Sequence, residues 1–258
     1  SVRYSQANTA LSNGDYDAAI AGFTALGSFR NAAARAVDAT YQKAREMTGL
    51  DEVNLVTSDA CPWFSITEDG VLSMRKDDYK GSWEKFVVPD LVDGILVREL
   101  DRNFFLNCKE LKAVVLSDCI EVLGEQTFYN CDALTEVRFG KNLKTISPRA
   151  FINCVSLTSI TILDTVVKIG LRAFNSCTAL TDVTLGRGIT ELPSYLFSCC
   201  YKLRRVNCLG VITSVGDFAF SDCPALEKLY VPAGCDWNAV AIGSDNDALS
   251  HAEIVVEK

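Results

Sequence analysis

Three kinds of side chain recur at a constant interval of 23 residues, and this repetition constrains the fold more than any other feature of the chain. The series comprise Phe105, Phe128, Phe151, Phe174, Phe197 and Phe220; Cys108, Cys131, Cys154, Cys177, Cys200 and Cys223; and Leu111, Leu134, Leu157, Leu180, Leu203 and Leu226. Residues that keep a constant spacing occupy equivalent places in repeated structural units. The sequence therefore predicts a repeat array over residues 97–232.

Each unit also carries a strand pattern, in which apolar residues alternate with variable ones, as at Val114 and Leu116. A second apolar pair, such as Ile120 and Leu123, closes the unit. Period-two alternation indicates parallel strands stacked one per coil. A fixed period of about 20–29 residues with several apolar positions is typical of a leucine-rich solenoid. The predicted fold class is an α/β leucine-rich-repeat solenoid with interior ladders of like side chains.

Residues 1–50 are predicted to form a small α-helical segment. Ala19, Ile20 and Phe23 give an apolar stripe at helical spacing, Asp15 is a predicted N-cap, and a third helix is expected over residues 31–47. The stretch from Gly14 to Ile20, followed by Phe23, resembles the turn and second helix of a tetratricopeptide repeat. That resemblance implies a peptide-binding or oligomerising module. The favoured alternative is a helical spacer or the stub of a longer array, because fewer than about three such repeats rarely stand alone.

The segments on either side of the repeats are predicted to be caps, because the end of a solenoid exposes an apolar cross-section. In residues 51–96, two short strands are expected around the Asp69-Gly70 turn, and Trp83 and Phe86 match strand positions of the last repeat. Residues 233–258 are expected to contain a short helix over 236–242 and a final edge strand over 252–257. This gives a β-type cap of 51–96, repeats of 97–232 and a C-terminal cap of 233–258.

The charge of −8 lies in the predicted caps and not in the repeats. Residues 97–232 hold 15 basic and 14 acidic side chains, whereas residues 51–96 hold 4 and 10, and residues 233–258 hold 1 and 5. Nothing in this distribution attracts a phosphate backbone, so nucleic acid is not an expected partner. No run of about eighteen apolar residues predicts a membrane span. The chain starts at Ser1 and not Met, so we expect the targeting segment to lie outside this sequence.

The repeat motif resembles a known family. The stretch from Val88 to Val97, running into Phe105 and Cys108, resembles the entry to BspA-like (treponemal-type) leucine-rich repeats of bacterial surface proteins. The Ala-Phe-x-x-Cys-x-x-Leu core stands intact at Ala150, Ala173 and Ala219, while Phe104, Thr127 and Leu196 replace the Ala and Cys208 replaces a strand Leu. The resemblance covers about residues 60–240. It implies an extracellular or cell-surface protein that binds host proteins or neighbouring cells.

The ladder cysteines are predicted to be reduced, buried side chains, because free Cys behaves as a small hydrophobe. Cys199 takes the place held by Asn in other units and is expected to point elsewhere. Cys61, Cys119 and Cys235 lie outside the ladder and are the expected reactive or bridging thiols. No Cys-x-x-Cys motif occurs and His251 is the only histidine, so no metal is predicted.

Catalysis is not predicted either. A single His leaves no base for a Ser or Cys triad, and no glycine pattern that binds phosphate occurs. The run Asp245-Asn246-Asp247 resembles the start of a calcium loop but lacks the later Gly and Glu. We therefore expect neither an enzyme nor a bound cofactor.

The remaining candidate site is the row of side chains that project outward from the strands, since solenoids use extended strand faces for recognition. The candidate residues are Glu136, Arg138, Thr161, Asp182, Thr184, Arg205, Asn207, Lys228 and Tyr230. Arg138, Arg205 and Tyr230 are favoured, because Arg and Tyr are enriched at binding hot spots. The competing interpretation is a merely solvated face.

Three functions follow from these observations. The leading hypothesis is a non-enzymatic adhesion or protein-interaction module of a bacterial cell-surface or secreted protein, with a protein partner on a host or neighbouring cell. The alternative is a structural stalk or spacer that oligomerises through residues 1–48. A third hypothesis is a carbohydrate binder that uses Trp63, Trp83 or Trp237. The sequence leaves the oligomeric state open.

Overall fold

The structure, a computed structural model, describes residues 2–26, 39, 42, 55–56, 64–74 and 83–257. It divides into two compact units, of which one comprises residues 1–61 and 89–96 and the other residues 62–88 and 97–258. The second unit holds the repeats. The division into four segments drawn from the sequence stays a prediction.

The first unit contains the two predicted helices, α1 (Val2–Ser12) and α2 (Tyr16–Thr24). Gly14 has a positive φ of 76° in the turn between them, and the Asp15 carboxylate caps α2 by accepting the Ala18 N–H at 3.2 Å. Phe23 is fully buried and its ring lies 5.6 Å from that of Tyr4. Most of the helix expected over residues 31–47 lies outside the described residues, and the tetratricopeptide-like character stays a prediction.

A small three-stranded sheet also belongs to the first unit. It contains β1 (Leu55–Val56), β5 (Leu91–Val92) and β6 (Ile95–Leu96). The antiparallel pair β5–β6 turns at Asp93 and Gly94, whose φ values of 52° and 77° suit a tight hairpin.

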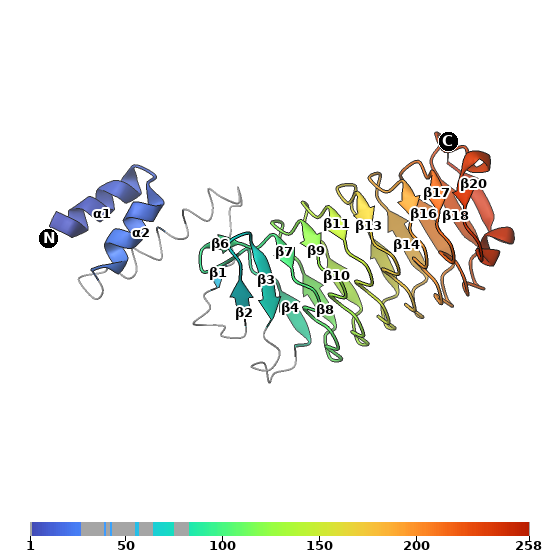
Figure 1. The fold of residues 1–258 in the computed structure, drawn as a ribbon, viewed down its shortest axis with the longest axis horizontal. Coiled ribbons are helices and arrows are strands. Elements are labelled where there is room, and N and C mark those ends of the chain that lie inside the picture. The colour runs from blue at the N-terminus through green and yellow to red at the C-terminus, as the bar shows by residue number, and fades with distance from the viewer. Residues whose placement is uncertain are drawn as a thin grey trace. The chain divides into compact units, whose positions relative to one another are not determined.

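The second unit is a solenoid whose coils each contribute one strand to each of two faces (Figure 1). Face A comprises β4 (Lys85–Val87), β8 (Ala113–Val115), β10 (Glu136–Arg138), β12 (Ser159–Thr161), β14 (Asp182–Leu185), β16 (Arg205–Cys208), β18 (Lys228–Val231) and β20 (Glu253–Val256). Face B comprises β2 (Phe64–Ile66), β3 (Val71–Met74), β7 (Glu99–Leu100), β9 (Val122–Leu123), β11 (Thr145–Ile146), β13 (Lys168–Ile169), β15 (Glu191–Leu192), β17 (Ser214–Val215) and β19 (Ala241–Ile242). All paired strands of these faces run parallel except β2 and β3, which form the predicted hairpin around Asp69-Gly70. The predicted parallel-strand solenoid with its short N-terminal helical segment is confirmed.

Within the coils, turns and not helices connect the faces. The described part of the solenoid contains two short 3-10 helices, η2 (Trp237–Ala239) and η3 (Asp247–Ser250). The Ala-Phe-x-x-Cys segments are successive turns that repeatedly use positive φ angles, for example 57° at Asn130 and 59° at Asn153. Asn tolerates this region better than most residues. The amides also bond from coil to coil, with Asn130 Nδ2 donating to Asn107 Oδ1 at 2.9 Å.

The phenylalanine ladder fills the interior. The rings of Phe105, Phe128, Phe151 and Phe174 are fully buried, and successive centroids lie 5.2, 4.9 and 5.0 Å apart with nearly parallel planes. This spacing is close to the separation of about 4.8 Å between neighbouring strands, so identical rings stack without strain. The backbone repeat and the side-chain stack therefore share one period.

The ladder cysteines do more than fill space. Each buried thiol donates to a phenylalanine carbonyl of the preceding coil, as from Cys131 to Phe105 at 3.1 Å and from Cys154 to Phe128 at 3.2 Å. The equivalent hydrogen bonds run from Cys177 to Phe151, from Cys200 to Phe174 and from Cys223 to Phe197. Each of these carbonyls also accepts the backbone N–H of the cysteine three residues further along, as Phe105 O does from Cys108 at 3.0 Å. The thiol therefore adds a second hydrogen bond to a carbonyl that is already paired.

Ion pairs also connect neighbouring coils. Glu121 accepts from Arg98 at 2.9 Å and from Lys144 at 2.5 Å, and so links three successive coils. Further pairs with a separation of 23 residues are Lys109–Asp132, Lys141–Asp118, Arg187–Asp164 and Arg204–Glu227. Opposite charges on adjacent coils explain why the repeats are nearly neutral.

We expect Phe151→Ala to lower the free energy of unfolding by about 3–5 kcal/mol, because it leaves a cavity between two stacked rings. Chemical denaturation monitored by circular dichroism measures this. The matched control is Val155→Ala, four residues away at a side chain that is 37% exposed, which should change stability little. Equal losses from the two variants would contradict the interior stack.

Candidate functional site

The strand register of face A aligns the predicted site residues in two outward rows. One row contains Asp182, Arg205 and Lys228 on β14, β16 and β18. The second row contains Thr161, Thr184, Asn207 and Tyr230 on β12 to β18. These seven residues belong to one five-stranded sheet, β12-β14-β16-β18-β20.

Glu136 and Arg138 lie on a different sheet. Both are exposed on β10, which belongs to the three-stranded sheet β10-β8-β4, and no strand pairing among the described residues joins β10 to β12. The same coil carries Phe139 where other coils carry Leu, Ile, Cys or Val, and its ring lies 6.2 Å from Phe151. The predicted site is therefore divided into two parts by an interruption of the backbone ladder.

The charges in the first row are paired within the face. Arg205 Nε lies 2.5 Å from Asp182 Oδ1, and Lys228 Nζ lies 3.1 Å from Glu253 Oε2. The hydrogen bond from Arg205 lowers the pKa of the Asp182 carboxyl below its ordinary value of 3.8. A charged partner would have to compete with these internal pairs. The second row, in contrast, contains no charged side chain.

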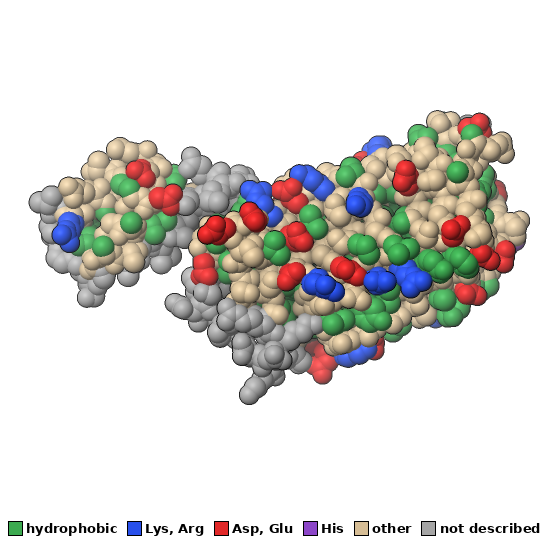
Figure 2. Space-filling model, in the orientation of Figure 1, with side chains coloured by type: hydrophobic (Ala, Val, Ile, Leu, Met, Phe, Trp, Pro, Cys, Tyr) green, Lys and Arg blue, Asp and Glu red, His purple; other side chains and the backbone are tan. Residues whose placement is uncertain are grey.

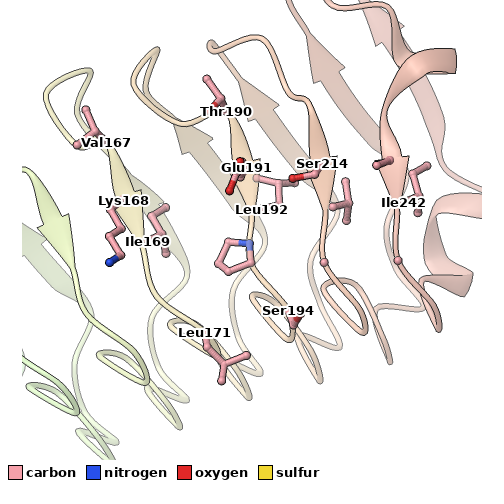
Figure 3. A pocket seen from close by; sticks show the side chains of 15 residues that line it. Val167, Lys168, Ile169, Leu171, Thr190, Glu191, Leu192, Ser194, Ser214 and Ile242 are labelled. Carbon is pink, nitrogen blue, oxygen red and sulfur yellow. The ribbon is translucent and has the colours of Figure 1, made fainter.

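A groove on face B was not anticipated from the sequence. It has a volume of about 880 Å³ and is lined by strands β13, β15, β17 and β19. Figure 3 shows Val167 and Thr190 at one end of the groove, and Leu171 and Ser194 at the other. Val167 is 65% exposed.

The groove lies where the backbone ladder of face B is interrupted. In other coils, the residue after the strand donates to the preceding coil, as Gly170 N–H does to Ile146 O at 2.8 Å and Gly216 N–H to Leu192 O at 2.7 Å. Pro193 occupies this position after β15 and has no N–H to donate. No strand pairing joins β13 to β15 in the described part of the chain. A proline in a position otherwise held by Gly, Ser or Asp was the sequence signal that could have located this interruption.

The structure reverses the expectation for two cysteines. Cys119 and Cys235 are buried, with 8% and 5% exposure, and are not reactive surface thiols. The cysteines that are partly exposed are Cys108 and Cys199. Cys199 Sγ lies 3.8 Å from Asp222 Oδ2. Cys61 lies outside the described residues.

The ladder thiols are held in the protonated form. Burial raises the pKa of Cys177 to about 12, and burial likewise raises the pKa of Cys223 to about 12. The pKa of Cys154 is raised well above 9.0 by burial and by the neighbouring Cys177. The thiolate is the reactive species, so these side chains are chemically inert in the folded protein.

The described residues contain no cluster of three or more His, Cys, Asp or Glu side chains that could hold a metal ion. No helix in the described part of the chain is long and apolar enough to cross a membrane. Trp83 is half-buried, and its ring lies 4.6 Å from that of Phe86 and 6.4 Å from that of Phe105. Trp237 begins η2, and Trp63 lies outside the described residues.

The stacked coils, interior ladders and outward strand rows define a leucine-rich repeat protein. Residues 98–232 match the family model described as the BspA type leucine rich repeat region, in six copies. The chain belongs to this BspA-type leucine-rich repeat family. A comparison with curated protein sequences gave no significant match.

Solved structures of similar proteins share the fold. A leucine-rich repeat protein of T. pallidum is 27% identical with a TM-score of 0.61, and the match covers 70% of this chain and 82% of that one. A leucine-rich cell surface protein of Faecalibacterium prausnitzii is 28% identical with a TM-score of 0.62, over 75% of this chain and 52% of that one. The pneumococcal vaccine antigen PcpA is 24% identical with a TM-score of 0.56, and the match covers 76% of this chain and 48% of that one. This chain thus spans about half the length of the last two proteins.

We expect Cys199 to react quickly with Ellman's reagent in native buffer, whereas Cys154, Cys177 and Cys200 should react only after unfolding, because burial suppresses their thiolates. Thiol titration in a Cys61→Ser background, with and without denaturant, measures this. Cys199→Ser should remove one fast equivalent. Fast labelling of Cys177, identified by mass spectrometry, would contradict the buried ladder.

Acid should destabilise the solenoid through carboxylates whose pKa is lowered on folding. For Asp118 the hydrogen bonds from Lys141 outweigh the effect of burial, and for Asp164 the bonds from Arg187 lower the pKa. A lowered pKa contributes stability that is present above the ordinary value of 3.8 and is lost as the pH falls through the folded-state value. The denaturant concentration at the unfolding midpoint should therefore decrease as the pH is lowered from about 5 to about 3. The decrease should be smaller for Asp118→Asn. An unchanged slope in that variant would exclude the pair as a cause.

Proposed function

We propose that this chain is a non-enzymatic protein-interaction module of a bacterial cell-surface or secreted protein, and that it binds a protein partner through face A. The observation that carries the proposal is the rigid register of the sheet β12-β14-β16-β18-β20, which aligns Thr161, Thr184, Asn207 and Tyr230 in one row. A row held by backbone pairing is organised before binding, so little conformational entropy is lost on association.

The composition of this row supports a protein partner. Threonine and asparagine offer hydrogen bonds without the desolvation cost of a charge, and Tyr230 offers a large apolar ring with a polar tip. The neighbouring ion pair Arg205–Asp182 sits at the rim of the row. The description of the F. prausnitzii protein as a cell surface protein supports an extracellular location.

The charge pattern argues against a polyanionic partner. Charged side chains of both signs are interspersed on the side of the solenoid that Figure 2 shows, without an extended basic region. The ion pairs between neighbouring coils neutralise much of the basic charge. A neutral or weakly charged protein surface is the complementary ligand for such a face.

The test is binding of the fluorescently labelled chain to intact epithelial cells and to intact bacterial cells by flow cytometry. We expect the face A variant Thr184→Ala, Asn207→Ala, Tyr230→Ala to lose at least about tenfold in affinity, because truncating hot-spot side chains removes their contacts. The matched control is the face B variant Lys168→Ala, Thr190→Ala, Glu191→Ala, which should bind normally. Protease treatment of the cells should abolish binding by the unmodified chain.

Two outcomes would oppose the proposal. If the face A variant binds cells normally and the face B variant loses cell binding, the partner binds the groove of face B and not face A. Absence of cell binding, together with light scattering that shows an oligomer lost on removal of residues 1–48, would favour the stalk or spacer role.

A further inference from the structure

The outer edge of β20 has unused backbone hydrogen-bonding groups. β20 is the last strand of its sheet, and among the described residues no strand pairs with its outer side. The N–H groups of Glu253 and Glu257 donate inward to carbonyls of the β18 segment, each at 2.8 Å. Alternate residues of a parallel strand bond to opposite sides, so the N–H and C=O groups of Ile254 and Val256 point outward.

The interior columns of the solenoid also reach the surface here. Leu229 and Val231 on β18 are fully buried, and Ile254 and Val256 are their partners in register on β20. Yet Val256 is 50% exposed, and Ile242, which continues the interior column of face B, is 46% exposed. Val256, an apolar side chain in register with the core, is therefore uncovered on the strand whose outer edge is unpaired.

The charge around this edge selects the kind of strand that fits it. Residues 233–258 contain five acidic side chains and one basic side chain, Lys258. Glu253 forms an ion pair with Lys228. Glu257 follows directly after β20 and has no ion pair among the described residues. Acidic residues flanking an edge discourage pairing with a like-charged strand. A second copy of the chain would bring acid against acid, since residues 51–96 are acidic as well.

We propose that the outer edge of β20 binds an extended segment of a partner protein in which apolar residues alternate with Lys or Arg. The segment adds one strand to face A: its backbone bonds to the groups of Ile254 and Val256, its apolar side chains cover the exposed column, and its basic side chains face Glu257. This site is distinct from the outward rows of face A and does not depend on them.

The probe is a blocked, fluorescently labelled peptide of about eight residues that alternates Val with Lys. We expect binding measured by fluorescence anisotropy to weaken as salt is raised, because the contacts with Glu257 are exposed to solvent. Hydrogen exchange should show the amides of Ile254 and Val256 protected by the peptide. The same peptide with Glu in place of Lys should bind at least about tenfold more weakly.

Val256→Lys should reduce the affinity for the Val-Lys peptide by at least about tenfold, because it replaces an apolar contact by a like charge. Val211→Lys, at a similarly exposed apolar residue away from β20, is the matched control and should bind normally. Circular dichroism melting verifies that both variants fold. The face A variant used above should also bind the peptide. Failure of the proposed β20 site can therefore be distinguished from failure of the proposed function.

Three results would overturn the proposal. They are no binding of the Val-Lys peptide by the unmodified chain at millimolar concentration, equal affinity for the Glu peptide, and normal binding by Val256→Lys. A concentration-dependent dimer in light scattering that Val256→Lys abolishes would identify a second copy as the occupant instead.

Discussion

The backbone hydrogen bonds between successive coils are the interaction on which the rest of this structure depends. They set the separation of the coils, and the stacked phenylalanine rings at about 5 Å repeat the same spacing. Because the two periods coincide, ring stacking, thiol hydrogen bonds and ion pairs between coils are all satisfied together. Where a residue cannot join the ladder, as at Pro193, the sheet is interrupted and a groove opens.

The cysteine ladder shows how one residue type meets two demands. A side chain at this position must be small, because the coils pack closely, and the thiol adds a second hydrogen bond to a carbonyl of the preceding coil that already accepts a backbone N–H. Serine would carry a more polar group into the core, and alanine would lose the thiol bond, although the backbone bond to the carbonyl would remain. The thiol does both, and its raised pKa keeps it protonated and unreactive.

The surfaces of the solenoid differ in how many of their charged and backbone groups are already paired within the chain. The charged row of face A is paired internally, and its neutral row is held in register by backbone pairing. The groove of face B includes the place where backbone pairing is missing between β13 and β15. The edge of β20 presents both unpaired backbone groups and uncovered core side chains. These differences distinguish surfaces that are built from the same repeated unit.

The sequence by itself determined the coil, because a period of 23 residues in three side-chain types is compatible with one stacking register only. It also placed Asp15 at a helix start, the Asp69-Gly70 hairpin and the outward rows, since each depends on local pattern. Only the tertiary structure decided that Glu136 and Arg138 lie on a separate sheet, that Arg205 is bonded to Asp182, and that Cys119 and Cys235 are buried. The physical reason is that pairing, exposure and sheet continuity depend on neighbours one coil away, and these neighbours differ from coil to coil although the repeat does not.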